Sequence, residues 1–288
     1  MNSPESQNTF KPKQALAPSP TLYDELVGNG MEELAKATIA EIAAIPRDAI
    51  VHDNGCGTGA ASAAVVAAVA DPTAPLKITG TDINDDALDI YRKRASEERW
   101  PASAQHVDAA RLTFDNETFT HSINNALLFV LPNDGIDAVK EVHRTLKPGG
   151  VALFNTWVFT PSLGPVQIAS KATRPPGTPE LRQGLDKWSR AEFLRTVLEQ
   201  GGFLKDNVDI VERDVYITTP SALKRLATIV WSFIGGTSSV GWLKEDEESW
   251  ERAVGIVMEE LKKTPGFQET HDGRCVLKFV VNIVTAKK

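Results

Sequence analysis

The chain has 288 residues, 42% of them hydrophobic and 24% charged, which is ordinary for a soluble globular protein with one large domain or two small ones. Its formal net charge of −7 argues against a general nucleic-acid binder, because phosphate contacts need clustered Lys and Arg. Cys56 and Cys275 are too few and too far apart for a disulfide framework, so we expect a reducing compartment and a cytoplasmic location.

The sequence predicts neither a signal peptide nor a membrane span. Glu41 and Pro46 break the apolar run near the N-terminus, and the C-terminal run 276–284 is short and contains Lys278. We therefore expect no membrane partner, and the composition leaves a monomer or a homodimer open.

The N-terminal region is predicted to consist of an arm followed by helices. Residues 1–20 combine four prolines with Ser and Asn and little apolar content, which predicts a flexible arm or a segment that orders over a ligand. Apolar residues recur at helical spacing over 23–45, with an interruption at 28–30. Pro46 ends this helical region.

Short apolar runs then alternate with helical patterns. Strands are predicted at 49–54, 76–84, 103–110, 120–130, 151–158, 208–218 and 275–286. Helices are predicted at 60–70, 85–100, 133–146 and 189–202. Such alternation favours a seven-stranded, mostly parallel sheet with helices on both faces.

The last two predicted strands are separated by an unusually long segment. Residues 219–273 contain helical patterns at 220–234 and 245–263 and aromatic residues suited to a hydrophobic ligand or to a core of their own. We expect this segment to be a helical cap over the carboxyl ends of the strands. The expected division is an arm at 1–20, a core domain at 21–218 plus 274–288, and the cap at 219–273.

A glycine-rich turn follows the first predicted strand. In "VHDNGCGTG", Gly55, Gly57 and Gly59 let the backbone turn tightly and bring N–H groups against a ligand. A dinucleotide site prefers G-x-G-x-x-G, which this turn lacks. Asp53 precedes the glycines, and its carboxylate would repel a pyrophosphate but attract an ammonium group. The turn therefore favours S-adenosylmethionine, with Asp53, Gly55, Cys56 and Gly57 at the cofactor.

Four segments in order resemble the class I S-adenosylmethionine-dependent methyltransferases. They are "VHDNGCGTG", "ITGTDIN", "VDAARLTF" and "EVHRTLKPGGVALFNTW", and the resemblance extends over roughly residues 45–160. The chain looks most like small-molecule methyltransferases of fungal secondary metabolism. This narrower resemblance lies in the motif "HDNGCGTG", the segment "FTHSINNALLFV" and the helical insertion before the last strand. The resemblance implies a Rossmann-like α/β fold and S-adenosylhomocysteine as product.

The resemblance also implies roles for single residues. Asp82 would accept the ribose hydroxyls, although an aspartate that only caps the next helix is the structural alternative. Ile83 would pack on the adenine, Asp108 would accept its amino group, and Ala109 would line the ring. Asn125 at the end of the fourth strand would meet the ligand through backbone and side chain.

The catalytic candidates are few. Methyl transfer is an in-line displacement that positioning alone can accelerate, so a general base is optional. His271, beside Asp272 before the last strand, could serve as that base or only shape a turn. Tyr23 could close over the donor or act only as a helix staple. No His and carboxylate set stands at ligand spacing, so we predict no metal.

Three functions remain open at this point. The first is methyl transfer to a hydroxyl or thiol of a hydrophobic small molecule, expected to be a secondary metabolite that the cap selects. The second keeps the fold and the cofactor but performs an isomerisation, a cyclisation or a regulatory role. The third, an NAD-dependent oxidoreductase, is disfavoured by the glycine spacing and by the absence of a Ser/Tyr/Lys set.

Overall fold

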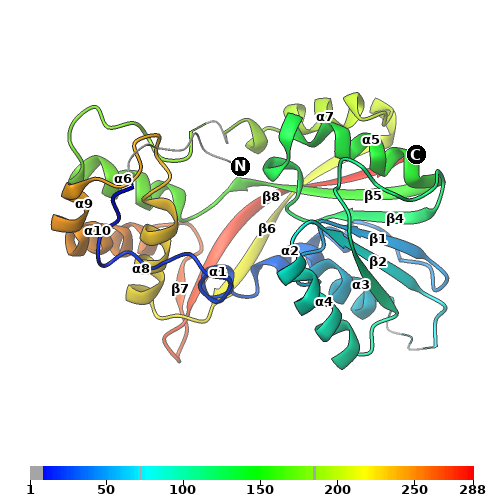
Figure 1. Cartoon of the computed structure of the whole chain (residues 1–288), viewed down its shortest axis with the longest axis horizontal. Helices are drawn as coiled ribbons and strands as arrows, with labels where there is room; N and C mark the ends of the chain where they lie inside the picture. Colours follow the sequence, from blue (N-terminus) through cyan, green and yellow to red (C-terminus); the bar gives the residue numbers. More distant parts are fainter. Residues whose placement is uncertain (1–8, 70, 72, 184–185) are drawn as a thin grey trace. The chain divides into compact units, whose positions relative to one another are not determined.

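The structure is a computed structural model that describes residues 9–69, 71, 73–183 and 186–288 (Figure 1). The helices are α1 (Pro20–Val27), α2 (Gly30–Ile39), α3 (Ala60–Val69), α4 (Asp85–Glu97), α5 (Ile136–Thr145), α6 (Leu163–Thr173), α7 (Ala191–Gln200), α8 (Leu223–Ile234), α9 (Lys244–Glu248) and α10 (Trp250–Lys262). The strands are β1 (Ile50–Asn54), β2 (Lys77–Asp82), β3 (Ala102–His106), β4 (Phe119–Asn124), β5 (Leu146–Phe159), β6 (Val208–Thr219), β7 (Gln268–Glu269) and β8 (Cys275–Lys287).

The strands form one sheet in the order β3-β2-β1-β4-β5-β8-β6. The pairs β2/β3, β1/β2, β1/β4 and β4/β5 are parallel, with His52 opposite Thr79 on one side and Ser122 on the other. The short β7 adds an antiparallel pair on β8. The predicted mostly parallel α/β sheet is confirmed, and its order reverses beside β1, where open α/β sheets bind ligands.

The chain divides into two compact units. The sheet unit comprises Met31–Val158, Lys187–Arg213 and Val281–Lys288. The helical unit comprises Met1–Gly30, Phe159–Asp186 and Asp214–Val280. Strands β6 and β8 contribute residues to both.

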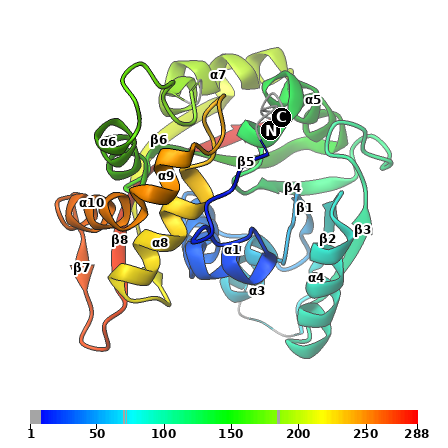
Figure 2. The same cartoon turned by 60° about the vertical axis from the view of Figure 1, so that its left-hand side comes forward.

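In the sheet unit, α2, α3 and α4 lie on one face of the sheet and α5 and α7 on the other (Figures 1 and 2). The alanine-rich α3 lets this layer pack closely, because Ala61, Ala64 and Val65 are buried against Val51 and Ile78 of the first two strands. A two-sided cover of this kind buries the strands of a parallel sheet. It leaves the carboxyl ends of β1, β2 and β4 to the connecting loops.

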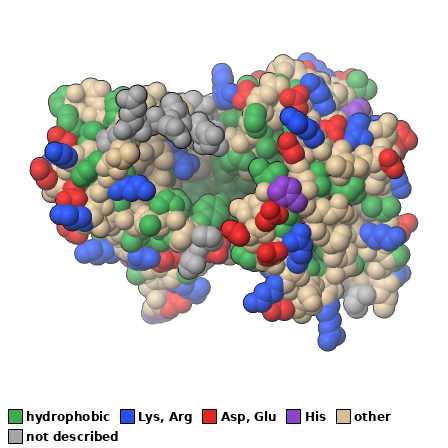
Figure 3. Space-filling view, viewed as in Figure 1, with side chains coloured by type: hydrophobic (Ala, Val, Ile, Leu, Met, Phe, Trp, Pro, Cys, Tyr) green, Lys and Arg blue, Asp and Glu red, His purple; other side chains and the backbone are tan. Residues whose placement is uncertain are grey.

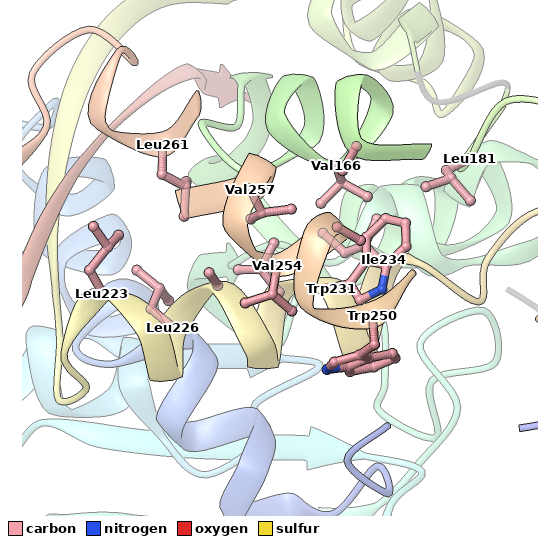
Figure 4. Packing of buried hydrophobic residues seen from close by; sticks show 14 of the residues in the cluster. Val166, Leu181, Leu223, Leu226, Trp231, Ile234, Trp250, Val254, Val257 and Leu261 are labelled. Atoms are coloured by element: carbon pink, nitrogen blue, oxygen red, sulfur yellow. The ribbon is translucent and has the colours of Figure 1, made fainter. Parts of the chain in front are cut away.

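The core of the helical unit is formed by α6, α8 and α10 (Figure 4). Val166 from α6, Leu226 from α8 and Val254 from α10 belong to one buried cluster. Trp231 and Trp250 are also buried in it, at 0% and 3% exposure. Of the two roles left open for the aromatic residues of this segment, Trp231 and Trp250 therefore have that of the unit's own core.

The helical unit is larger than the expected cap at 219–273. Helix α6 was not predicted, yet Val166 and Ala169 are fully buried against α8 and α10, which makes 159–186 part of this unit. The N-terminal arm also belongs to it. Phe10 and Ala15 pack against the cluster, and Leu16 N–H donates to Ser232 Oγ at 3.2 Å. The expectation of a flexible arm falls partly on residues 1–8, outside the described residues.

Among the described residues, no helix is both long enough and apolar enough to cross a bilayer. On the face drawn in Figure 3, Lys and Arg side chains are interspersed with Asp and Glu rather than gathered into one basic patch.

Candidate active site

The glycine turn joins β1 to α3 and is held by backbone hydrogen bonds. Gly55, Gly57 and Gly59 have φ values of +68°, +49° and +94°, a left-handed region that strains residues with a side chain. Cys56 N–H donates to Thr81 O of β2, and Gly59 N–H donates to Cys56 O, both at 2.9 Å. A Cβ on Gly59 would lie 2.7 Å from the Trp100 ring. The sequence thus needs glycine here for both conformation and space.

Asp82 ends β2 directly beside this turn. Its Oδ2 accepts from Gly57 N–H and its Oδ1 from Asn84 N–H, each at 2.9 Å. The two bonds fix the carboxylate and leave each oxygen further lone pairs for hydroxyl donors. The role of capping α4, the structural alternative for Asp82, belongs to Asn84, whose Oδ1 accepts from Ala87 N–H at 3.2 Å. A Cβ built on Gly57 would meet no atom within 4 Å, so there is open space at this glycine, whose N–H the carboxylate accepts from.

Asp53 has a different setting from the one its sequence position suggested. Its side chain is buried, and its Oδ2 accepts from Ser62 N–H at 2.9 Å and from Ser62 Oγ at 2.7 Å. Ser62 Oγ also bonds Tyr91 Oη at 2.7 Å. Asp53 therefore satisfies an amide in the first turn of α3, while its Oδ1 is buried without a hydrogen-bond partner among the described residues.

The surroundings of two buried neighbours shift their pKa values in opposite directions. Burial raises the pKa of Asp53 from 3.8 to about 6, against the hydrogen bonds from Ser62 and with a contribution from Asp82. Burial lowers the pKa of His52 from 6.5 to about 3. His52 bonds Thr81 Oγ1 at 2.9 Å and stacks on Phe119, so it is a neutral core residue, as its place in the strand predicted.

These shifts predict how stability depends on pH. Folded Asp53 binds its proton at higher pH than the unfolded chain does, so this group stabilises the fold increasingly as the pH falls from about 6 to about 4. His52 has the opposite effect, because the unfolded chain takes up its proton first. The variant Asp53→Asn removes the favourable change alone. Relative to this variant, the native protein should gain about 1.4 kcal/mol per pH unit over that window.

Urea titrations of the native protein and Asp53→Asn at about pH 6 and about pH 4.5 measure how their free energies of unfolding change with pH. Asn at this position keeps an oxygen acceptor for Ser62, so the comparison isolates the titration. Parallel pH dependences of the two proteins would contradict a raised Asp53 pKa.

Cys56 lies in the turn but is buried at 5% exposure in a cluster with Leu88 and Tyr91. Burial, together with the charges of Asp53 and Asp82, raises the pKa of its thiol. A Cβ on Gly80 would come within 2.9 Å of its sulfur. Cys56 is thus a small, buried and unreactive residue, and it contributes to the turn through its backbone.

The adenine-side candidates lie at the ends of β2 and β3. Ile83 is 64% exposed, which is unusual for a large apolar side chain and suits a residue that covers a ligand ring. Val107 N–H donates to Asp82 O at 3.1 Å and joins the two strand ends. Asp108 is exposed and accepts from Ala110 N–H at 2.9 Å, while Ala109 is buried. The structure brings this group beside Asp82.

Asn125 follows β4, and its side chain is used within the protein. Its Nδ2 donates to Met31 O at 3.2 Å, and its Oδ1 accepts from Asn155 Nδ2 at 2.9 Å. Its neighbour Leu127 packs beside the glycine turn, because a Cβ on Gly55 would lie 2.5 Å from Leu127 Cδ1. The segment after β4 thus contacts the turn, and the side-chain amide of Asn125, which was predicted to meet the ligand, is already bonded within the protein.

The two catalytic candidates belong to the helical unit, and the cofactor candidates belong to the sheet unit. His271 is exposed in the turn between β7 and β8. Tyr23 on α1 is 47% exposed and meets Phe233 edge to face, with ring centroids 6.4 Å apart. Burial raises the pKa of Tyr23, with a further contribution from Asp24 and an opposing one from Arg182.

The sequence did not predict the buried side-chain amides at the carboxyl ends of β1 and β4. Asn54 Nδ2 donates to Asn124 Oδ1 at 2.9 Å and ties β1 to β4. Asn124 Nδ2 donates in turn to Leu153 O of β5 at 3.2 Å. Asn side chains inside strands that otherwise read as apolar were the available signal. Over the described part of the chain, no group of three or more His, Cys, Asp or Glu could hold a metal ion.

Comparison with known proteins agrees with this geometry. Residues 51–150 match the family described as a methyltransferase domain. The chain is 28% identical over 254 residues to methyltransferase tpcH of Aspergillus fumigatus, covering 84% of this chain and 86% of that one. It is 25% identical over 245 residues to acetylaranotin bis-thiomethyltransferase of Aspergillus terreus, with 82% of each chain covered.

The fold also resembles solved structures. A candidate methyltransferase of Bacillus halodurans superposes with a TM-score of 0.55 at 16% identity, covering 88% of this chain and 98% of that one. This likeness confirms the predicted Rossmann-like fold.

Proposed function

Because the chain is a methyltransferase with a class I fold, we propose that it transfers a methyl group from S-adenosylmethionine to a hydroxyl or thiol of a hydrophobic small molecule of secondary metabolism. The observation that carries this proposal is the Asp82 carboxylate beside the open space at Gly57. Both lie at the carboxyl ends of the first two strands, beside the point where the sheet order reverses.

The residues present fit S-adenosylmethionine. Asp82 would accept the two ribose hydroxyls, Ile83 would cover the adenine, and Asp108 would accept the adenine amino group. The Asp82 carboxylate beside the glycine turn would repel a phosphate and suits a cofactor that carries positive charge. When bound, this cofactor supplies an electrophilic methyl group on a sulfonium.

The contribution of the protein to the reaction is positioning. Holding the acceptor atom in line with the methyl group supplies on the order of 7–11 kcal/mol in favourable cases. A thiol acceptor needs little help from a base, since its thiolate is accessible near neutral pH. The name of the Aspergillus terreus relative, a thiomethyltransferase, supports thiols as the first acceptors to test. The catalytic roles of His271 and Tyr23 stay predictions.

Two measurements test the proposal. Calorimetry should give micromolar binding of S-adenosylhomocysteine and no binding of NAD, since the glycine turn lacks the dinucleotide spacing. Incubation with S-adenosylmethionine and a panel of hydrophobic thiols and phenols should give products heavier by one methyl group. Binding of NAD alone would contradict the cofactor assignment. Consumption of an acceptor without gain of a methyl group would instead support the isomerase or cyclase alternative.

A further inference from the structure

Asn155 is a buried amide in the middle of β5 that joins three elements of the sheet unit. Its Oδ1 accepts from Ala126 N–H at 2.7 Å. Its Nδ2 donates to Thr38 Oγ1 of α2 at 2.8 Å and to Asn125 Oδ1 at 2.9 Å. The side chain is 0% exposed, so it reaches no ligand directly. Every one of these bonds ends on α2 or on the segment that follows β4.

The backbone of that segment is strained at Ala126. Its φ is +55°, a left-handed conformation that an alanine rarely adopts. Such a conformation persists where the surroundings determine it, and strained residues of this kind cluster at ligand sites. Here the surroundings are two bonds: Asn155 holds the Ala126 amide, and Asn125 Nδ2 donates to Met31 O at 3.2 Å.

The strained turn sets the position of Leu127. The Leu127 side chain occupies the space that a Cβ on Gly55 would need, and it shares a buried cluster with Ala109. One side chain therefore lies against the glycine turn and belongs to the same buried cluster as the segment expected at the adenine. A shift of residues 125–127 would therefore change the packing of both the glycine turn and the segment that contains Ala109.

We propose that Asn155 is a positioning residue for the cofactor site. It holds Ala126 in its left-handed turn, so that Leu127 presses the glycine turn and the Asp108 segment into the geometry that binds S-adenosylmethionine. The proposal deepens the proposed function and rests on it, because it concerns the same site.

The test uses the variant Asn155→Ala and S-adenosylhomocysteine binding by calorimetry. Removing the acceptor leaves the Ala126 amide buried and unbonded, so we expect the dissociation constant to rise about tenfold. The control is Asn282→Ala, which removes another buried amide of the sheet unit, bonded through Nδ2 to Ser189 O at 3.2 Å. It should lose stability but keep the native affinity.

A second substitution separates positioning from general destabilisation. Glycine adopts a φ of +55° without strain, so Asn155→Ala combined with Ala126→Gly should recover most of the lost affinity. Equal affinities of Asn155→Ala and the native protein would overturn the inference. So would equal losses in Asn155→Ala and Asn282→Ala, or a failure of Ala126→Gly to restore binding.

A measurement on the native protein covers the case in which Asn155→Ala does not fold. Hydrogen exchange of the Ala126 amide, read by NMR, should be slowed by a large factor even without ligand, because Asn155 accepts its proton. Exchange at the rate of an open chain would overturn the inference. If the native protein does not bind S-adenosylhomocysteine, the proposed function fails, and the exchange result still decides whether Asn155 holds this turn.

Discussion

Replacing Asp246 by Ala is expected to destabilise the helical unit by about 3–5 kcal/mol, because it leaves the Arg174 guanidinium buried without its counter-charge. The two side chains are 1% and 0% exposed, and Arg174 Nε and Nη2 donate to the two Asp246 oxygens at 2.8 and 2.9 Å. The pair connects the end of α6 to α9. Few other single changes in this unit would leave a charge so completely enclosed.

Arg174 also organises the segment between α8 and α9. Its guanidinium donates to Gly235 O, to Ser238 Oγ at 3.2 Å and to Gly241 O at 3.4 Å. Its Cζ lies 5.8 Å and 5.7 Å from the ring centroids of Trp231 and Trp242. The loss of Asp246 should therefore loosen residues 235–243 as well as the two helices.

Urea unfolding followed by tryptophan fluorescence measures this effect, since Trp231, Trp242 and Trp250 all belong to the unit. The matched control is Glu180→Ala, which breaks the exposed Lys171–Glu180 pair of the same unit and should cost no more than about 1 kcal/mol. The double variant Arg174→Met, Asp246→Leu should be more stable than Asp246→Ala, because no charge is left buried. A cost for Asp246→Ala as small as the control's would show that water reaches the guanidinium.

The sequence was sufficient to predict the features that local patterns determine. Gly55, Gly57 and Gly59 have positive φ values, for which glycine is the favoured residue. The three glycines in the sequence therefore indicate the turn. Asp82 stands at the end of the short segment "LKITGTD", which is predicted to be a strand, so the sequence also indicates where that strand ends. The alternation of strands and helices then determines the parallel sheet.

The features that escaped prediction depend on partners far away in the chain. Thr38 and Asn155 are 117 residues apart, and Arg174 and Asp246 are 72 residues apart. Helix α6 begins Leu-Gly-Pro, a sequence that reads as a turn, and it exists because its apolar face is buried against α8 and α10. None of these pairings leaves a local signature.

Asp53 shows how a correct motif can still mislead about a side chain. A carboxylate at this position can attract a positively charged ligand, but it also lies near the free amides at the start of α3. These amides need acceptors whether or not a ligand is bound. Asp53 Oδ2 meets that need by accepting from the Ser62 N–H, and it also accepts from Ser62 Oγ, so only Oδ1 remains for other partners.

The variant Asp82→Ala is expected to weaken S-adenosylhomocysteine binding about a hundredfold, since it would remove the proposed carboxylate acceptor of two ribose hydroxyls, each hydrogen bond to a charged group being worth about 1.5–3 kcal/mol. It also frees the Gly57 and Asn84 amides that hold the turn. Asp82→Asn keeps one oxygen acceptor and should fall between the native protein and Asp82→Ala. Calorimetry on the three proteins gives the series.

The control for this series is Asp89→Ala on α4, an exposed carboxylate paired with Arg92, which should bind as the native protein does. A truncated ligand sharpens the test, because 2′-deoxy- or 3′-deoxyadenosine derivatives of the cofactor lose the same contacts from the other side. If Asp82 accepts both hydroxyls, removing a hydroxyl should cost the native protein affinity and cost Asp82→Ala almost nothing. Additive losses would mean that the ribose is held elsewhere, and that Asp82 serves only to fix the glycine turn.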